Sequence, residues 1–280
     1  MKVTIRLDKM LGNLGYGTRS QIKILIKQGA VAVNGKLAKD HGMQINPKED
    51  EVVLDGETIK YRDTVYVLLH KPAGVISATE DSRDQTVIDL LDEDLAVLSP
   101  FPVGRLDKDT EGLLIITNDG KLSHELLSPR KHVPKTYRAL VAGDVGTDDA
   151  EAFLKGVALD DGYETMPAQL LVRAKTRNDG APEVEDELYA TEMIDAIKLA
   201  PKQEEEISMD VLSWIELTIH EGKFHQVKRM FEAVGKKVLY LRRISMGPLQ
   251  LDASLAPGEW RELTEEEVES LRNYRKEGKV

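Results

Sequence analysis

The sequence predicts an α+β protein in two parts, a small N-terminal αβ domain over residues 1–60 and a larger domain over residues 61–280. Two observations carry this prediction. Two short helical patterns precede a hairpin signal in the first part, and strands and helices then alternate irregularly, which is typical of a largely antiparallel mixed sheet flanked by helices. With 280 residues, of which 41% are hydrophobic, the chain can bury a sizeable core without cross-links.

The N-terminal part has clear signals for where its elements end. Ser20 is the expected N-cap of the second helix, and Gly29 is expected to end it in a left-handed conformation. Asn34 and Gly35 form a dipeptide typical of a tight β-hairpin turn. The expected elements are the helices 4–12 and 20–28 and the strands 31–33 and 51–54.

The larger part is expected to contain a sheet with helices packed against it. The expected strands are 64–69, 113–117, 136–142, 169–173, 214–219 and 237–244. The expected helices are 87–91, 121–127, 148–155, 225–234 and 265–275. Thr264 is the predicted N-cap of the last helix, because acidic residues that favour a helix N-terminus follow it directly.

The charge of the chain is unevenly distributed. The net charge of −11 alone argues weakly against a nucleic-acid partner. However, residues 1–39 contain eight Lys or Arg against one acid, and residues 220–243 contain seven against two, so a polyanion has two basic segments on which to dock. Residues 176–210 contain eleven acids against three basic residues. We expect them to form a mobile, solvated inserted loop with a short helix over 187–199, as a tolerated surface insertion or a functional arm.

Composition excludes several classes of protein. The absence of cysteine excludes disulfides, Cys-ligated zinc, iron–sulfur clusters and thiol nucleophiles. No apolar run approaches the roughly 20 residues that a membrane helix needs, and the N-terminus lacks the apolar core of a signal peptide. We therefore expect a cytoplasmic protein without a membrane partner.

The stretch GRLDKDTEGLLIITNDG over 104–120 joins a glycine-bounded polar loop to a buried apolar strand. A loop held by a rigid strand is a suitable place for a reactive carboxylate. The candidates are Asp107, Asp109, Glu111 and Asp119, and their spacing does not choose among them. These acids also suggest a magnesium site, but no glycine-rich phosphate loop accompanies them.

Two other stretches suit RNA binding. Residues 221–230, EGKFHQVKRM, open a helix rich in cations, which indicates a phosphate site or an ordinary charged helix face. His225 in this stretch is either a packed histidine or a functional one, and no second histidine follows at metal-binding spacing. In PKTYR over 134–138, Tyr137 is either a buried anchor or a platform for a base.

Together these stretches resemble the pseudouridine synthases, in particular the family of the small-subunit ribosomal pseudouridine synthase A. GRLDKDTEGLLIITNDG is similar to the catalytic motif of that family, and HKPAGVISA over 70–78 to its first strand and turn. SPRKHVPKTYRALV resembles the segment with the active-site tyrosine, and EGKFHQVKRMFEAVGKKVLYLRRISMGPLQL resembles the closing motif. Residues 1–60, with RLDKML and TRSQIKILIKQGAVAVNGK, resemble an S4 RNA-binding domain. The resemblance covers nearly the whole chain except 176–210.

The resemblance implies a set of site residues. Asp107 matches the catalytic aspartate, and Tyr137 matches the tyrosine that packs against the target base. Lys228 matches the basic position that pairs with the aspartate, and Arg229 is the second candidate for that pairing. Arg105 matches the position that helps to displace and hold the flipped nucleotide. The other residues expected to bind RNA are His225, Gln226, Arg6, Lys9, Arg19, Lys23 and Lys27.

The implied activity is conversion of one uridine to pseudouridine in ribosomal RNA, with 16S RNA favoured by the variant FHQVKRM. The implied enzyme is a monomer that needs no cofactor and no metal, and its RNA is either free or part of an assembling small subunit. The target base must leave the RNA stack, after which a carboxylate attacks C1′ or C6 or takes a proton from C2′. Three alternatives stay open: a 23S target, a non-catalytic S4-type assembly factor, and a metal-dependent phosphoryl-transfer enzyme that uses Asp107, Asp109 and Asp119.

Overall fold

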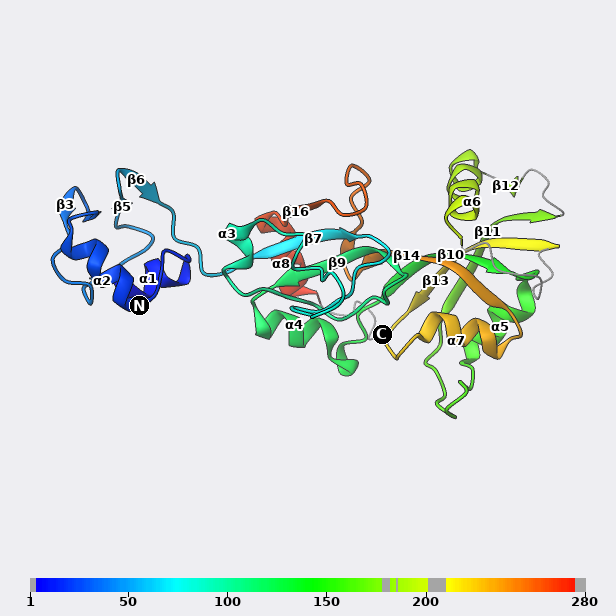
Figure 1. Ribbon diagram of the computed structural model, residues 1–280. Helices are drawn as coiled ribbons and strands as arrows, with labels where there is room; N and C mark the ends of the chain where they lie inside the picture. Colours follow the sequence, from blue (N-terminus) through cyan, green and yellow to red (C-terminus); the bar gives the residue numbers. More distant parts are fainter. Residues whose placement is uncertain (1–3, 178–181, 185, 201–209, 275–280) are drawn as a thin grey trace.

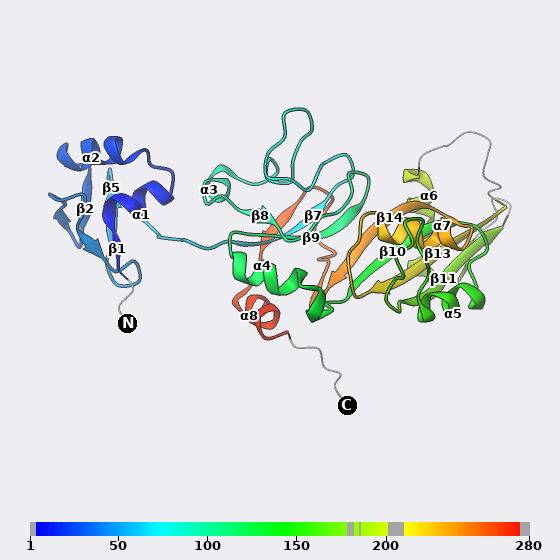
Figure 2. The same ribbon diagram turned by 90° about the horizontal axis from the view of Figure 1, so that it is seen from below.

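The computed structural model describes residues 4–177, 182–184, 186–200 and 210–274. It has a small N-terminal domain joined by an extended segment to a larger α+β domain (Figure 1 and, turned by 90°, Figure 2). No helix of the described residues is long and apolar enough to cross a membrane.

The N-terminal domain packs two helices against short antiparallel strands around its own apolar core. Its elements are β1 (Ile5–Arg6), α1 (Leu7–Asn13), α2 (Arg19–Lys27), β2 (Val31–Val33), β3 (Lys36–Leu37), β4 (Gln44–Ile45), β5 (Val52–Leu54) and β6 (Glu57–Ile59). The turn at Asn34 and Gly35 is confirmed, since both residues have positive φ, of 51° and 73°. The left-handed end of α2 at Gly29, with φ of 79°, is also confirmed.

Two boundaries in this domain differ from the prediction. The first helix begins at Leu7 rather than at residue 4, because Ile5 pairs with Ile45 in a short antiparallel ladder. Ser20 lies inside the second helix, and the N-cap of that helix is Thr18. Thr18 accepts from the Gln21 backbone N–H at 3.4 Å, and the Gln21 side chain accepts from the Thr18 N–H at 2.7 Å. This reciprocal capping box satisfies two free backbone donors.

The larger domain is built on one long sheet in the order β12-β11-β13-β10-β14-β9-β7-β16, antiparallel except where β14 meets β9. Its strands are β7 (Tyr66–Lys71), β8 (Phe101–Pro102), β9 (Glu111–Thr117), β10 (Lys135–Ala142), β11 (Gln169–Arg177), β12 (Glu183–Val184), β13 (Val211–Ile219), β14 (Lys237–Met246), β15 (Leu249–Gln250) and β16 (Trp260–Glu262). Its helices are α3 (Glu93–Ala96), α4 (Gly120–Leu127), the 3-10 turn η1 (Pro129–Lys131), α5 (Thr147–Lys155), α6 (Glu187–Leu199), α7 (Gln226–Ala233) and α8 (Glu265–Asn273). The predicted α+β class with a largely antiparallel mixed sheet is confirmed.

The six predicted strands and four of the five predicted helices of this domain form, with ends shifted by a few residues. The helix expected over 87–91 is wrong. That segment is a series of turns, in which Asp89 accepts hydrogen bonds from the Thr86 backbone N–H and hydroxyl at 2.7 and 2.9 Å. Such local side-chain bonds offer the backbone an alternative to a helix. Thr264 caps α8 as expected, and residue 275 lies outside the described residues.

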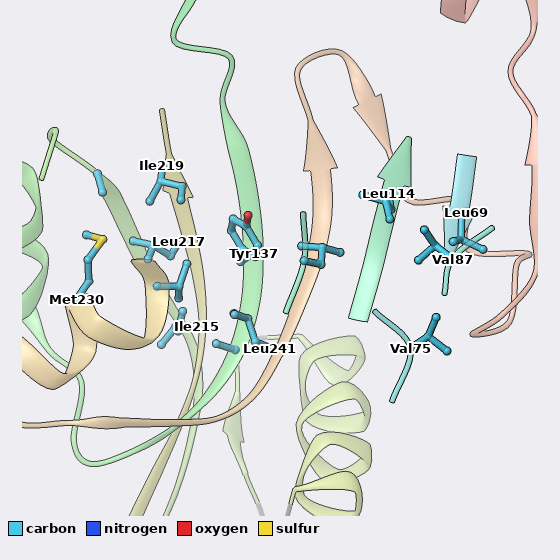
Figure 3. Packing of buried hydrophobic residues seen from close by; sticks show 14 of the residues in the cluster. Leu69, Val75, Val87, Leu114, Tyr137, Ile215, Leu217, Ile219, Met230 and Leu241 are labelled. Atoms are coloured by element: carbon cyan, nitrogen blue, oxygen red, sulfur yellow. The ribbon is translucent and has the colours of Figure 1, made fainter. Parts of the chain in front are cut away.

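Alternate residues of the central strands point to opposite faces of the sheet, and each face has its own helices. On one face, Tyr137, Leu217 and Leu241 pack with Met230 of α7 in the largest apolar cluster. Figure 3 shows this row of apolar side chains continuing across the sheet to Leu69 of β7. On the other face, α6 packs over Trp214 and its neighbours. Figure 1 shows α6 and α7 on opposite sides of the sheet.

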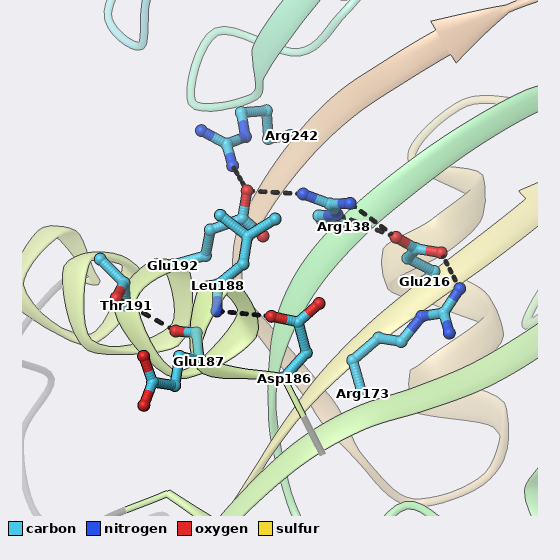
Figure 4. A network of polar contacts seen from close by, with 9 residues as sticks. All are labelled: Arg138, Arg173, Asp186, Glu187, Leu188, Thr191, Glu192, Glu216 and Arg242. Atoms are coloured by element: carbon cyan, nitrogen blue, oxygen red, sulfur yellow. Dashed lines mark hydrogen bonds and ion pairs between the residues drawn. The ribbon is translucent and has the colours of Figure 1, made fainter. Parts of the chain in front are cut away.

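The acidic segment is not only a solvated loop. Its helix α6 forms as predicted, but Met193 and Ala196 are buried against the sheet. Glu192 accepts from Arg138 at 2.5 Å and from Arg242 at 3.1 Å, as Figure 4 shows. Buried apolar contacts and a half-buried ion network therefore anchor this helix, and part of its negative charge is used within the protein. Residues 178–181, 185 and 201–209 of the segment lie outside the described residues.

Candidate active site

The loop before β9 holds Asp107 at a defined place because its backbone is bonded on both sides. The Ser77 hydroxyl donates to the Leu106 carbonyl at 2.9 Å and accepts from the Leu106 N–H at 3.0 Å. The Gly74 N–H donates to the Lys108 carbonyl at 2.7 Å. The turn that follows β7 therefore clamps the residues before and after Asp107, whose side chain stays about one-quarter exposed. This supplies the rigid support that a reactive carboxylate needs.

A buried lysine, Lys71, supports the same loop from below. Its side chain has no exposed surface, and its Nζ donates to the carbonyls of Pro72 and Thr110, each at 2.9 Å, and of Lys108 at 3.3 Å. Burial lowers the pKa of Lys71 to about 8, although the carboxylate of Asp109 and other nearby acids oppose the shift. The sequence reasoning missed this residue. The available signal was a lysine at the end of a largely apolar strand.

The lowered pKa of Lys71 predicts a pH dependence of stability. Between pH 8 and its ordinary value of 10.5, the unfolded chain holds a proton at this site that the folded chain lacks. The contribution of Lys71 to the free energy of unfolding therefore rises with pH, by at most about 1.4 kcal/mol per pH unit, and is constant below pH 8. Urea unfolding at several pH values measures this effect. Across this window, the free energy of unfolding of wild type should rise relative to that of Lys71→Met.

The exposed Lys121 provides the control for this measurement, because Lys121→Met removes a lysine on the surface of α4. We expect that variant to follow the wild-type dependence on pH. A constant difference between wild type and Lys71→Met from pH 8 to pH 10 would contradict the prediction.

The cation predicted to pair with Asp107 lies between two carboxylates. Lys228 Nζ is 3.6 Å from Asp107 Oδ2 and donates to both oxygens of Asp109, at 2.7 and 2.8 Å. On the other side, His225 Nε2 is 3.5 Å from Asp107 Oδ1. Lys228 is the first-turn residue of α7 that faces the loop, so the helix and the loop meet through this pair. The structure thus brings Asp107, Lys228 and His225 together, with Asp109 as an additional partner that the prediction lacked.

Tyr137 of β10 is 8% exposed and belongs to the same apolar cluster as Leu106 and Val227. These are the chain neighbours of Asp107 and Lys228. One packed cluster therefore supports all three residues predicted to be catalytic, from a loop, a strand and a helix. The tyrosine is buried, as one of the two interpretations of the sequence expected.

Two residues predicted to act at the site are used elsewhere. Arg229, the second candidate for the ion pair with Asp107, instead binds Asp160 and lies 2.7 Å from Asp161. Gln226, which was predicted to bind RNA, is only 4% exposed. Its Nε2 donates to Glu221 at 2.8 Å. Consecutive positions on α7 point in different directions, which is why neighbours in the sequence have unrelated partners.

The other predicted RNA contacts are at the surface. Arg105 is exposed and has no ion pair or hydrogen bond with another described residue. The predicted RNA contacts Lys9, Arg19, Lys23 and Lys27 of the N-terminal domain are all exposed. Arg6 is also exposed, but its guanidinium pairs at 2.7 Å with Asp8, whose carboxylate is buried. Arg6 therefore has a structural partner that the sequence did not indicate.

The acids proposed for metal-dependent chemistry do not converge. Asp119 lies beyond the far end of β9 from Asp107, about 20 Å of strand away. It caps α4 by accepting from the Leu122 N–H at 3.0 Å, and it accepts from the Tyr66 hydroxyl at 2.8 Å. Among the described residues, no group of three or more potential acidic or histidine ligands is placed to hold a metal ion. The set Asp107, Asp109 and Asp119 is thus not assembled as phosphoryl transfer would require.

Comparison with known proteins identifies the family of the chain. The family model of RNA pseudouridylate synthases matches residues 65–233, and that of the S4 domain matches residues 5–52. The uncharacterized RNA pseudouridine synthase YtzG of Bacillus subtilis is 46% identical over 95% of this chain and 98% of its own. Ribosomal small subunit pseudouridine synthase A of Vibrio cholerae is 39% identical over 95% and 99%, and that of Escherichia coli is 36% identical over 95% and 100%.

Among solved structures, a crystal structure of a pseudouridylate synthase has a TM-score of 0.58 and 34% identity, and the match covers 95% of this chain and 99% of the other. Sequence, domain composition and fold therefore agree. The chain belongs to the RNA pseudouridine synthases of the ribosomal small subunit pseudouridine synthase A type, a family of isomerases that convert uridine in RNA to pseudouridine.

Proposed function

We propose that this protein converts one specific uridine of 16S ribosomal RNA to pseudouridine and that Asp107 is the reacting carboxylate. The observation that carries the proposal is the placement of Asp107 on a clamped loop, between the cation of Lys228 and the imidazole of His225. The similarity along nearly the whole chain to enzymes named for the ribosomal small subunit supports the choice of RNA.

The reaction is an isomerisation in which atoms and electrons balance within the substrate. The bond between N1 and C1′ breaks, the uracil turns, and C5 bonds to C1′. The hydrogen on C5 leaves as a proton, and N1 gains one. A carboxylate promotes these steps by adding to C1′ or C6 or by taking a proton from C2′. In each route the base must first leave the RNA stack, and the buried ring of Tyr137 would form the floor that receives it.

The two domains divide the work in this proposal. The S4 domain, over residues 1–60, supplies affinity through Lys9, Arg19, Lys23 and Lys27, which neutralise phosphates. The domain over 61–280 supplies the chemistry, and Arg105 helps to hold the flipped nucleotide. We propose further that the protein acts as a monomer in the cytoplasm, on ribosomal RNA that is free or part of an assembling subunit.

Pseudouridine mapping on 16S and 23S RNA tests the proposal. Cells that lack the protein would be complemented with wild type or with Asp107→Asn. Loss of one 16S site that only wild type restores is the expected result. A lost 23S site would replace the proposed substrate, and an unchanged map in both RNAs would favour an S4-type binding or assembly role.

Removal of the cation beside Asp107 should impair the reaction more than RNA binding. We expect Lys228→Met to lower kcat by about 10²-fold, because it deletes the positive charge 3.6 Å from the carboxylate, and to change the RNA Kd less than about threefold. Release of tritium from [5-³H]uridine-labelled 16S RNA measures the first effect, and filter binding measures the second.

The next residue in the chain supplies the control for this experiment. Arg229→Met also removes one cation from α7, but its guanidinium pairs with Asp160 and Asp161 rather than with Asp107. We expect this variant to keep kcat within a few-fold of wild type. Equal losses in both variants would show that the charge of the helix matters, and not the pairing with Asp107.

A further inference from the structure

An exposed aromatic ring lies next to the predicted catalytic carboxylate. Phe224 is 76% exposed, the highest value among the large apolar side chains of the described residues. Its ring stacks on the imidazole of His225, with 3.8 Å between ring centroids and 18° between planes. The edge of the same imidazole carries Nε2, which is 3.5 Å from Asp107 Oδ1. One face of Phe224 is therefore covered by a residue that contacts Asp107, and the other face is left to solvent.

The turn that presents Phe224 is held in place by buried groups. Gln226 accepts from the Lys223 N–H at 2.9 Å and donates to Glu221 at 2.8 Å, and both Gln226 and Glu221 are buried. His225 has a φ of +48°, a left-handed conformation that a residue with a side chain adopts only when its surroundings impose it. Phe224 thus projects into solvent from a fixed turn.

Basic residues lie close to Phe224 in the chain and at the site. Lys223 precedes Phe224, and the Nζ of Lys223 lies 4.2 Å from the centre of the Tyr163 ring. Arg105 is exposed two residues before Asp107, and Lys228, in the first turn of α7, follows Phe224 by four residues in the chain. Proteins that bind single-stranded nucleic acid combine an exposed aromatic face with cations nearby in the groove, because the cations attract the phosphates while the ring stacks on a base.

We infer that Phe224 is a stacking platform for the base of an unpaired nucleotide adjacent to the target uridine in the RNA strand. This inference rests on the proposed function. The target base itself belongs with the buried ring of Tyr137, whereas Phe224 lies on the solvent side of His225. When one base is extruded, its neighbour loses a stacking partner, and a ring that replaces this partner lowers the cost of the extrusion.

A series of substitutions at this one position tests the inference. Phe224→Ala and Phe224→Leu remove the aromatic face, and Leu keeps most of the apolar volume, whereas Phe224→Trp keeps an aromatic face. We expect Ala and Leu to weaken RNA binding and raise KM by about 5- to 150-fold, with kcat at saturating RNA nearly unchanged, and we expect Trp to retain wild-type binding. The probe is a fluorescein-labelled fragment of 16S RNA that contains the mapped uridine.

Leu199→Ala provides a matched control, because Leu199 is 62% exposed on α6, on the other face of the sheet. Equal binding by the Ala, Leu and Trp variants would overturn the inference. So would a fall in kcat with unchanged Kd, which would mean that Phe224 only positions His225 beside Asp107. If wild type released no tritium from ribosomal RNA, the proposed function would fail, and binding of the same variants to an oligouridylate would still test the platform.

Discussion

Asp107→Asn is expected to abolish pseudouridine formation, with a loss of more than about 10³-fold in the rate of tritium release. The amide keeps the shape of the side chain but cannot act as a nucleophile or accept a proton. The loop should stay in place, because its clamps are the Ser77 hydroxyl, the Gly74 N–H and the Lys71 ammonium. Single-turnover release of tritium measures the rate, and anisotropy measures RNA affinity, which we expect to be retained.

Asp109→Asn is the matched control, because it makes the same chemical change two residues away. Asp109 is bonded to Lys228, but its side chain is 71% exposed, whereas that of Asp107 is 27% exposed. We expect this variant to lose no more than about tenfold in rate, since it loosens Lys228 but leaves the reacting group. If both variants lost a comparable part of the rate, the geometry of the site would not identify Asp107 as the reacting carboxylate.

Gly112→Ala is expected to lower the free energy of unfolding by at least about 3 kcal/mol. Gly112 lies in β9 where that strand pairs in parallel with Arg243 of β14, and its φ is +107°. A Cβ atom there would be 2.2 Å from the Arg243 carbonyl oxygen and 2.7 Å from its nitrogen. Neither backbone atom can move without separating β9 from β14. The pairing of these two strands joins the two halves of the sheet. Urea unfolding followed by circular dichroism measures the effect.

Gly120→Ala tests whether the loss comes from this close approach. Gly120 is the first residue of α4, and a Cβ atom there would have no neighbour within 4 Å. Alanine also favours a helix more than glycine does, so the control should be neutral or slightly more stable than wild type. If Gly112→Ala were as stable as Gly120→Ala, β9 and β14 would be able to move apart without loss of stability. Gly112 also follows Asp107, the proposed reacting group, by five residues, so we expect its substitution to lower activity.

Helices, strands and turns that are determined by a few consecutive residues could be predicted from the sequence. The apolar run before Asn118 gave β9, the dipeptide Asn34-Gly35 gave the hairpin, and Thr264 with the acids after it gave α8. The helix expected over 87–91 failed because Thr86 and Asp89 bond to each other locally, which a periodic pattern of apolar residues does not reveal. The start of α2 was predicted at the wrong residue because Thr18 and Ser20 can both cap a helix, and the sequence does not show which of them does so.

The site was predictable in its central residues and not in their partners. The motif around Asp107 identified the loop, and the helix that begins after His225 identified the cation. The sequence did not show that Lys228 also binds Asp109, or that Arg229 binds Asp160 instead. An ion pair forms between groups that folding brings together from distant parts of the chain, and no spacing within a motif records that distance.

The sequence by itself determined the class of fold, the family and the carboxylate to which the chemistry is proposed to belong, because these depend on local periodicity and on motifs that are contiguous in the chain. Only the tertiary structure decided which charges are buried or used internally. It placed Lys71 beneath the loop that carries Asp107, Gln226 in the interior and Glu192 in an ion network. It also left Phe224 exposed beside His225. The physical reason is that burial and electrostatic partners depend on how strands and helices far apart in the sequence pack, and this packing alone sets which groups remain available to RNA.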